Sequence, residues 1–312
     1  MRVLVLGSGK IARLRARILT QDRRVSWVGI ASQSAERARE AAAVSGASAS
    51  GTIRAMLEQA PDAVLIASST ARHAEDIRAC LPLQLPLFCE KPIGSNVTEA
   101  AALAMETDAA GVALQVGFDR RFDPGLAALR AAVEAGELGE LQSLALTSHD
   151  RDPPGEAFAA ASGGMFLDLH IHDFDLARWL TGQEVSDVTS VGARRGPCTF
   201  LDGLGDVDTT AIVLRMADGL PVTIRGSRQD QAGYMMRTEL VGSARSATIA
   251  DRRYADYRER FNDALVAETH AFVEFAAGLR PNPCPAQECV TAMQVALAAE
   301  LSSSERRTVS LL

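Results

Sequence analysis

A glycine turn directly after the first apolar run is the feature that most restricts the fold of this chain. Residues Val3–Leu6 are apolar, and the sequence Gly7-Ser8-Gly9-Lys10-Ile11-Ala12 follows them. The first glycine permits a tight turn, and Ala12 is small enough for a helix to pack against the preceding strand. The spacing of apolar residues predicts an amphipathic helix over Ile11–Leu19. The segment therefore predicts a buried strand, a turn and a helix in that order.

Four further apolar runs repeat this pattern over the first third of the chain. Alanine-rich, helix-favouring stretches separate the runs, which cover Val25–Ala31, Ala63–Ala67, Leu87–Cys89 and Val112–Val116. Strands that alternate with helices indicate βαβ units and a parallel sheet. Residues 1–119 are therefore expected to form a doubly wound α/β domain of the Rossmann type.

A second domain is expected after Phe122-Asp123-Pro124, where the pattern changes. Two longer strands, Asp208–Met216 and Leu220–Arg228, flank an Asp-Gly hairpin signal. The other expected elements are a helix over Leu126–Ala135 and, on either side of a proline cluster, helices over Phe261–Ala277 and Ala286–Leu301. A chain of 312 residues exceeds one ordinary core. Residues 120–312 are therefore predicted to form an α/β domain with a large open, mainly antiparallel sheet.

Charge and composition exclude several classes of partner. The net charge of −7 and the isoelectric point near 5.4 argue against binding to nucleic acid or to an anionic membrane, so small molecules are the expected partners. Five cysteines without a CxxC pair argue against a disulfide framework and fit a reducing cytoplasm. Neither a secretory signal nor a membrane-spanning apolar segment is recognised, so a cytoplasmic location is expected.

The glycine turn is also a candidate binding site for a dinucleotide. The second glycine lets a pyrophosphate approach the backbone, and the helix that follows offers unpaired amides and a positive dipole to the phosphates. A merely structural turn is the alternative. The position of the turn after a strand and before a helix favours binding of NAD or NADP through Gly7, Ser8, Gly9, Lys10, Ile11 and Ala12.

The end of the second strand should distinguish NAD from NADP. An acidic residue roughly 20 residues after the glycines would bind the ribose diol of NAD. The sequence there is Ala31-Ser32-Gln33-Ser34, and Asp22 lies before the strand, at its wrong end. The missing carboxylate favours NADP, with Ser32, Gln33 and Ser34 as donors and Arg37 as an ion partner. An NAD enzyme with an ordinary polar turn is the alternative.

One of only two lysines stands in a motif suited to chemistry. The chain has 32 lysines and arginines, of which only Lys10 and Lys91 are lysines, and Lys91 lies in Glu90-Lys91-Pro92 directly after a predicted strand. A compact ammonium with an adjustable pKa cannot be replaced by a planar guanidinium. Chance survival of this lysine in an arginine-rich chain is the alternative.

A second catalytic candidate lies in the segment Gly163–Gly182, which is predicted to be one helix. Asp168 and His172 are four residues apart and would share a helix face, whereas His170 would point elsewhere. A carboxylate one turn away can orient the imidazole of His172 as a general base. A structural histidine is the alternative, and a metal site is disfavoured because His170 and His172 cannot converge on one ion from one helix.

Together, the glycine turn, Glu90-Lys91-Pro92 and the Gly163–Gly182 segment resemble the glucose-fructose oxidoreductase/inositol dehydrogenase/rhizopine-catabolism (Gfo/Idh/MocA) family, especially its inositol 2-dehydrogenase branch. The resemblance extends over the whole chain and includes Gln115–Asp123, Ser148–Pro154 and Gly205–Thr209. It is specific for the family and less so for the substrate. The chain departs from the family pattern at Ser32, where the NAD-selecting aspartate is usual, and at Glu288-Cys289, where Asp-Gly is common.

The resemblance assigns roles to individual residues. It implies that Lys91 reaches both the nicotinamide and the substrate hydroxyl, that Asp168 binds substrate and that His172 is the catalytic histidine. Other residues that it implies are Ser68, His73, Glu90 and Pro92 near the cofactor, and Asp150, Arg151 and Tyr234 in the polyol pocket.

The expected activity is the reversible oxidation of a secondary hydroxyl of a cyclic polyol or sugar with NAD(P). Two alternatives are an NAD-dependent glycosidase or other sugar-modifying enzyme, which borrows and returns the hydride, and a regulator that senses dinucleotide without catalysis. The presence of Lys91, Asp168 and His172 favours an enzyme over a regulator. The resemblance also implies a homodimer or homotetramer built on the open sheet of the second domain.

Overall fold

The contacts within the chain define two compact units. The computed structural model describes residues 1–250 and 252–311. Unit 1 comprises Met1–Asp119 and Leu265–Val290, and unit 2 comprises Arg120–Ala264 and the residues from Thr291 onward. The sequence prediction placed the whole of 120–312 in one domain, whereas the contacts group Leu265–Val290 with the first unit.

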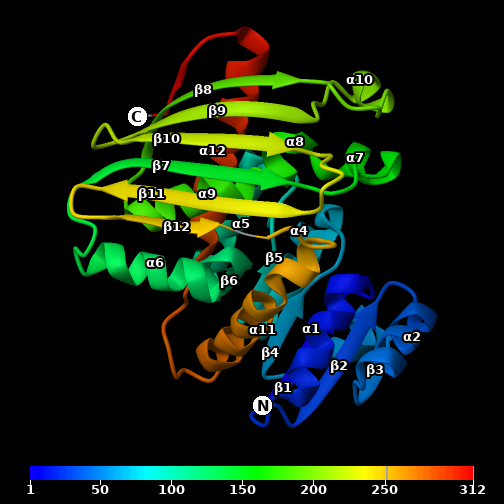
Figure 1. Ribbon diagram of the computed structural model, residues 1–312. Helices are drawn as coiled ribbons and strands as arrows, with labels where there is room; N and C mark the ends of the chain where they lie inside the picture. The colour runs from blue at the N-terminus through cyan, green and yellow to red at the C-terminus, as the bar shows by residue number, and fades with distance from the viewer. Residues whose placement is uncertain (251, 312) are drawn as a thin grey trace. The chain divides into compact units, whose positions relative to one another are not determined.

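Unit 1 contains the predicted doubly wound parallel sheet. Its six strands lie in the order β3-β2-β1-β4-β5-β6, and every neighbouring pair is parallel (Figure 1). The strands are β1 (Arg2–Leu6), β2 (Trp27–Ser32), β3 (Ala49–Thr52), β4 (Ala63–Ile66), β5 (Leu87–Glu90) and β6 (Leu114–Gly117). The order reverses between β1 and β4, and ligands bind at such a switch point in open α/β sheets.

The helices of unit 1 follow from the apolar spacing of the sequence. Helix α1 buries Ala12, Ala16 and Leu19, which are four and three residues apart and face the sheet. The remaining helices are α2 (Ala35–Ser45), α3 (Ile53–Leu57), α4 (Thr70–Cys80), η1 (Leu81–Leu83) and α5 (Val97–Ala109), after α1 (Lys10–Gln21). The second half of α11 (Tyr257–Ala276) contributes Phe272 and Val273 to the same core.

Unit 2 contains the predicted large, mainly antiparallel sheet. Its seven strands lie side by side in the order β12-β11-β7-β10-β9-β8-β13 (Figure 1), and only β7 and β10 form a parallel pair. The strands are β7 (Leu141–His149), β8 (Val185–Ala193), β9 (Thr209–Met216), β10 (Pro221–Ser227), β11 (Met235–Gly242), β12 (Ser246–Ala250) and β13 (Val309–Ser310). Strands β9 and β10 form the predicted hairpin, in which Leu214 is opposite Val222.

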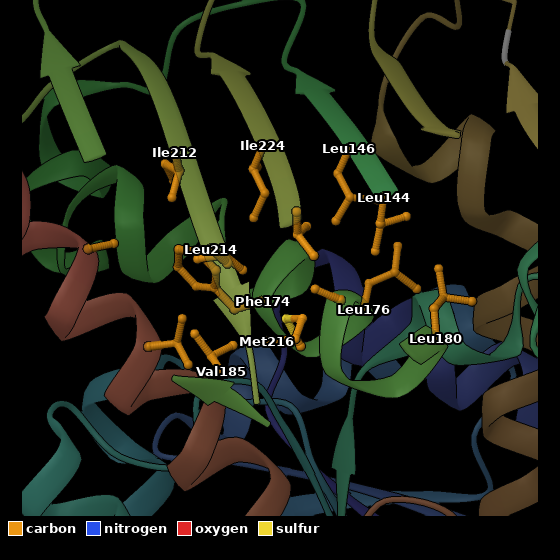
Figure 2. Packing of buried hydrophobic residues seen from close by; sticks show 14 of the residues in the cluster. Leu144, Leu146, Phe174, Leu176, Leu180, Val185, Ile212, Leu214, Met216 and Ile224 are labelled. Carbon is orange, nitrogen blue, oxygen red and sulfur yellow. The ribbon is translucent and has the colours of Figure 1, made fainter. Parts of the chain in front are cut away.

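The core of unit 2 fixes helix α9 against this sheet. Figure 2 shows Leu146, Ile212 and Ile224 of the strands directed toward Phe174, Leu176 and Leu180 of α9, all of which are buried. The helices of unit 2 are η2 (Asp119–Phe122), α6 (Pro124–Glu134), α7 (Glu156–Ser162), α8 (Gly164–Asp168), α9 (Ile171–Thr181), α10 (Phe200–Leu204), the first part of α11 and most of α12 (Ala286–Glu305). Helix α9, which carries His172, is therefore packed on a rigid sheet.

The single helix predicted over Gly163–Gly182 is wrong, because the structure divides it. Helix α8 ends at Asp168 and α9 begins at Ile171. The amides of Leu169 and His170 both donate to the carbonyl of Met165, at 3.1 and 3.2 Å, so the regular hydrogen-bond ladder is interrupted there. The spacing that would place Asp168 and His172 on one helix face crosses this interruption.

All five cysteines are buried and unbridged. Burial raises the pKa of the Cys80 thiol to about 12 and the pKa of Cys89 well above its usual value. The thiols of Cys80 and Cys89 are therefore protonated and unreactive near neutral pH. Over residues 1–250 and 252–311, no helix combines the length and the apolar character needed to cross a membrane.

Candidate active site

The glycine turn between β1 and α1 fits a dinucleotide. A Cβ on Gly7, whose φ is +131°, would fall 2.9 Å from the amide nitrogen of Ser68, so only glycine allows this approach of β4. A Cβ on Gly9 would meet nothing within 4 Å, and Gly9 caps α1 without a side-chain hydrogen bond. The space beside the start of α1 is therefore open, as the approach of a phosphate to the first amides of a helix requires.

A hollow of about 650 Å³ begins at the end of β2. Ser32 and Gln33 line it, and the Ser32 hydroxyl lies 3.3 Å from that of Ser8. Gln33 accepts hydrogen bonds from Arg72 at 2.5 and 3.2 Å when its amide oxygen faces that guanidinium. The hollow also has Arg54 and three carboxylates, those of Glu58, Glu75 and Asp76, on its walls.

The other two predicted residues of this region, the donor Ser34 and the ion partner Arg37, lie at the start of helix α2. The Ser34 hydroxyl caps α2 by accepting from the amide of Arg37 at 3.3 Å, and the Arg37 side chain is exposed in the first turn. Arg72 was not predicted to contribute to cofactor binding. Its position in α4 gave no signal, because arginine is common throughout this chain.

Lys91 follows strand β5 in a segment that is held at both ends. Its peptide bond to Pro92 is cis, and the carbonyl of Pro92 lies 2.7 Å from Nδ1 of the buried His73. The other ring nitrogen of His73 lies 3.2 Å from the carbonyl of Ser68, whose hydroxyl donates to Asp76 at 2.6 Å. His73 and Ser68 thus support the lysine turn from α4 and from the loop after β4.

In unit 2, Asp168 lies at the end of α8 beside a buried arginine. Its Oδ2 is 4.0 Å from a terminal nitrogen of Arg228, which is also 3.4 Å from Asp206. Asp206 accepts from the amide of Met165 at 2.8 Å and so fixes the start of α8. The Asp168 side chain retains 23% exposure, whereas Arg228 is almost fully buried, so the carboxylate remains accessible.

His172 lies in an aromatic environment. Its ring is 6.1 Å from that of Tyr257, which packs edge-on at 5.9 Å against the buried Tyr234. Phe261 completes this group, at 4.9 Å from Tyr257. Sequence reasoning singled out Tyr234 and missed Tyr257, which is distant from His172 along the chain.

His170, which the sequence placed outside the catalytic group, belongs to a buried structural network. Its Nδ1 lies 2.7 Å from Asp173 and its Nε2 lies 2.6 Å from the hydroxyl of Thr210. Asp173 also contacts Arg120 at 2.5 Å and Ser148 at 2.7 Å. Burial alone would raise the pKa of Asp173, but Arg120 and His170 together with Ser148 lower it. The network therefore anchors α9 to the sheet as a set of charges.

Among the residues that the structure describes, no three histidine, cysteine, aspartate or glutamate side chains have an arrangement that could hold a metal ion. The polar groups are instead paired with arginines. Asp175, for example, accepts from Arg121 at 2.9 and 2.5 Å.

Comparison with known proteins identifies the family. Residues 1–118 match the oxidoreductase family with an NAD-binding Rossmann fold, and residues 126–248 match the GFO/IDH/MocA C-terminal domain. The chain belongs to the Gfo/Idh/MocA family. It is 34% identical to the myo-inositol 2-dehydrogenase of Thermotoga maritima, over 100% of this chain and 98% of that protein.

Solved structures of related proteins share the fold along the whole chain. A myo-inositol dehydrogenase from Corynebacterium glutamicum has a TM-score of 0.93 with 28% identity and covers 100% of this chain and 99% of that one. A scyllo-inositol dehydrogenase from Lactobacillus casei, solved with NAD(H) and scyllo-inositol, has a TM-score of 0.88 with 25% identity, and the match covers 99% and 98% of the two chains.

The Gfo/Idh/MocA resemblance had assigned three further residues to a polyol pocket. Asp150 directly follows β7 and is partly buried, with its amide bonded to Ser227 at 2.8 Å. Arg151 is half exposed and lies 3.9 Å from Asp152. Tyr234 belongs to the aromatic group around His172.

Proposed function

We propose that this chain is an NAD(P)-dependent dehydrogenase that oxidises a secondary hydroxyl of a cyclic polyol of the inositol class. The observation that carries the proposal is the full-length similarity to a protein named myo-inositol 2-dehydrogenase. The structure named as containing both NAD(H) and scyllo-inositol supports the same cofactor and substrate class. The glycine turn, the supported Lys91 turn and the accessible Asp168 carboxylate are consistent with it.

Bound NAD(P) would supply the hydride acceptor. We propose that unit 1 holds it, with the first amides of α1 at the phosphates and with Ser68, His73, Glu90 and Pro92 supporting the nicotinamide side. His172, which is buried beside the ring of Tyr257, would accept the proton of the reacting hydroxyl. Lys91 would stabilise the charge that develops on the same oxygen. Asp168 would accept hydrogen bonds from neighbouring hydroxyls and so orient the ring.

We also propose that NADP binds more tightly than NAD. Ser32 places no carboxylate at the end of β2 to repel a 2′-phosphate. Arg72 lies beside Gln33, and its guanidinium, which pairs with Glu75 at 2.7 Å and with Asp76 at 3.0 Å, would also contact the phosphate. Titration of both cofactors into the wild type, Ser32→Asp and Arg72→Met tests this choice. Ser32→Asp should reverse the preference and Arg72→Met should weaken NADP alone, whereas tighter binding of NAD by the wild type would refute it.

A homo-oligomer is proposed on the outer face of the unit 2 sheet. Val191 of β8 and Val213 of β9 are 66% and 49% exposed there. Light scattering after gel filtration would measure the mass, and Val213→Glu should lower it to that of one 33.1 kDa chain. A wild type that is already monomeric would contradict this proposal.

The experiment that tests the function is a screen of inositols and aldoses with both cofactors, read as formation of reduced nicotinamide. We expect one reduced cofactor for each polyol oxidised, and His172→Ala should lose about 10²–10⁴-fold in turnover while retaining cofactor binding. Product formation without net cofactor reduction would favour the glycosidase alternative. Cofactor binding without any turnover would favour the regulator.

A further inference from the structure

Arg15, on helix α1, is the most completely paired buried cation in unit 1 among the described residues. It is fully buried, and its Nε and a terminal nitrogen lie 3.0 and 2.9 Å from the same oxygen of Glu90. The other terminal nitrogen donates to the Leu265 carbonyl at 3.0 Å and to the Thr269 hydroxyl at 2.8 Å. Glu268 of α11 accepts from the guanidinium as well. One side chain therefore joins α1, β5 and α11.

Arg15 pairs with two carboxylates, and Glu90 is the one that lies next to the lysine. Burial raises the pKa of Glu268 well above its usual value, and the neighbouring Asp119 and Glu90 raise it further against the opposing effect of Arg15. Glu268 is fully buried on α11, whereas Glu90 is 19% exposed at the end of β5. Pairing with the buried guanidinium of Arg15 holds the Glu90 carboxylate firmly in place.

The pairing of Arg15 with Glu90 bears on the reaction because Glu90 lies next to Lys91. Glu90 ends β5 and immediately precedes Lys91, while His73 holds the far side of the lysine at the Pro92 carbonyl. The neighbouring strand makes room for the glutamate, because a Cβ on Gly117 would fall 2.9 Å from the Glu90 carboxylate. The segment that carries the catalytic lysine is thus fixed from one side by Arg15 and from the other by His73.

We propose that Arg15 is a positioning residue for Lys91 and that it acts through Glu90. The inference rests on the proposed function of Lys91, but the position of the ammonium can be measured without turnover. Because Arg15 lies about 1.7 turns after the glycine cap, the helix that would offer its amides to the cofactor also holds the lysine strand.

The chain offers a matched control in Arg24. This arginine also connects the α1 region to α11, since it binds Asp22 at 2.6 Å and Glu274 at 2.8 Å. It is 36% exposed, and within the described part of the chain its hydrogen bonds and ion pairs do not reach the lysine turn. Replacing either arginine by methionine removes a link between the same two elements. Only Arg15→Met should disturb Lys91.

The kinetic test is a double-mutant comparison of Arg15→Met with Lys91→Met. We expect Arg15→Met to lower kcat about 10- to 100-fold with the Kd of the cofactor changed less than about threefold, because a displaced catalytic group costs roughly that factor. The double variant should be no slower than Lys91→Met alone, because Arg15 acts only through that lysine. If the losses in kcat of Arg15→Met and Lys91→Met multiplied in the double variant, the inference would be overturned. An Arg15→Met variant with the same kcat as Arg24→Met would also overturn it.

A spectroscopic test uses the scarcity of lysine. Reductive methylation with ¹³C-formaldehyde labels only Lys10, Lys91 and the N-terminal amine, and Lys91→Met assigns the Lys91 signal. Arg15→Met should shift or broaden that signal, and Arg24→Met should leave it in place. An unchanged Lys91 signal in Arg15→Met would overturn the inference, whether or not the protein oxidises a polyol. Failure to oxidise any polyol would separately refute the proposed function.

Two conservative variants guard against misfolding of Arg15→Met. Arg15→Lys keeps the charge but cannot reach Glu90, Leu265 and Thr269 together, and Glu90→Gln keeps an oxygen acceptor without the charge. Both should show intermediate losses in kcat with unfolding midpoints near that of the wild type. If both matched the wild type in kcat and in the Lys91 signal, Arg15 would be structural only.

Discussion

The two glycines of the turn after β1 should respond differently to the same substitution. At Gly7, alanine would have to adopt φ of +131° and would place its Cβ 2.7 Å from the carbonyl carbon of Ala67. The strained backbone costs about 1–3 kcal/mol and the contact adds to it, so Gly7→Ala should lose at least about 3 kcal/mol of unfolding free energy. At Gly9, φ is −73° and a Cβ meets nothing. Gly9→Ala should lose about 0.5–1 kcal/mol through weaker helix capping and gain about 0.5–1 kcal/mol because alanine lowers the entropy of the unfolded chain, so the two effects nearly cancel.

Gly9→Ala should therefore keep its stability within about 1 kcal/mol and still bind cofactor at least about tenfold more weakly. Its new methyl group would occupy the space through which phosphates reach the first amides of α1. Urea unfolding measures the first quantity, and the fluorescence of bound reduced nicotinamide measures the second. Wild-type cofactor affinity in a folded Gly9→Ala protein would refute the assignment of the phosphate site, and wild-type stability in Gly7→Ala would refute the steric argument.

Three further predictions follow from the buried charges, the thiols and the lysine. Burial places the folded-state pKa of Glu268 above its unfolded value of 4.5, so the stability it contributes is complete below that pH and is lost as the pH rises toward the folded value. Urea unfolding across pH should show Glu268→Gln gaining on the wild type as the pH rises, and parallel curves would contradict this. Because burial raises the pKa of Cys80 to about 12 and that of Cys89 well above normal, these two thiols should react negligibly with iodoacetamide at pH 8 in the native protein, as peptide mass spectrometry would measure. Rapid labelling of either thiol would show that it is accessible. Lys91→Arg and Lys91→Met should each lose about a hundredfold in kcat/KM, and a loss of only a few-fold in Lys91→Arg would reduce Lys91 to a source of charge.

Local features of the sequence predicted local structure. The glycine turn was located because its strand, turn and helix are contiguous, and the β9–β10 hairpin was located because Asp218-Gly219 lies between alternating strands. Strand β3 was missed, because Ala49–Thr52 has no β-branched apolar run and is only partly buried. The interruption between α8 and α9 was missed because neither glycine nor proline marks it.

Features that depend on distant residues could not be predicted in this way. The grouping of Leu265–Val290 with unit 1 depends on contacts such as that between Arg15 and Glu268, which are 253 residues apart. Arg228 beside Asp168 and Arg72 beside Gln33 were missed for another reason, since an arginine-rich chain gives single arginines no distinguishing signal. Lysine is rare in this chain, and for that reason the sequence could single out Lys91 as a catalytic candidate.

The central claim, that this chain transfers hydride from a polyol carbon to its cofactor, can be tested by following deuterium. The best inositol substrate from the screen, deuterated at the carbon that is oxidised, would be incubated with oxidised cofactor and the products analysed by mass spectrometry. One deuterium recovered in reduced NAD or NADP for each ketone formed is the predicted result. Oxidation without deuterium in the cofactor, or an oxidised cofactor at the end of the reaction, would contradict it.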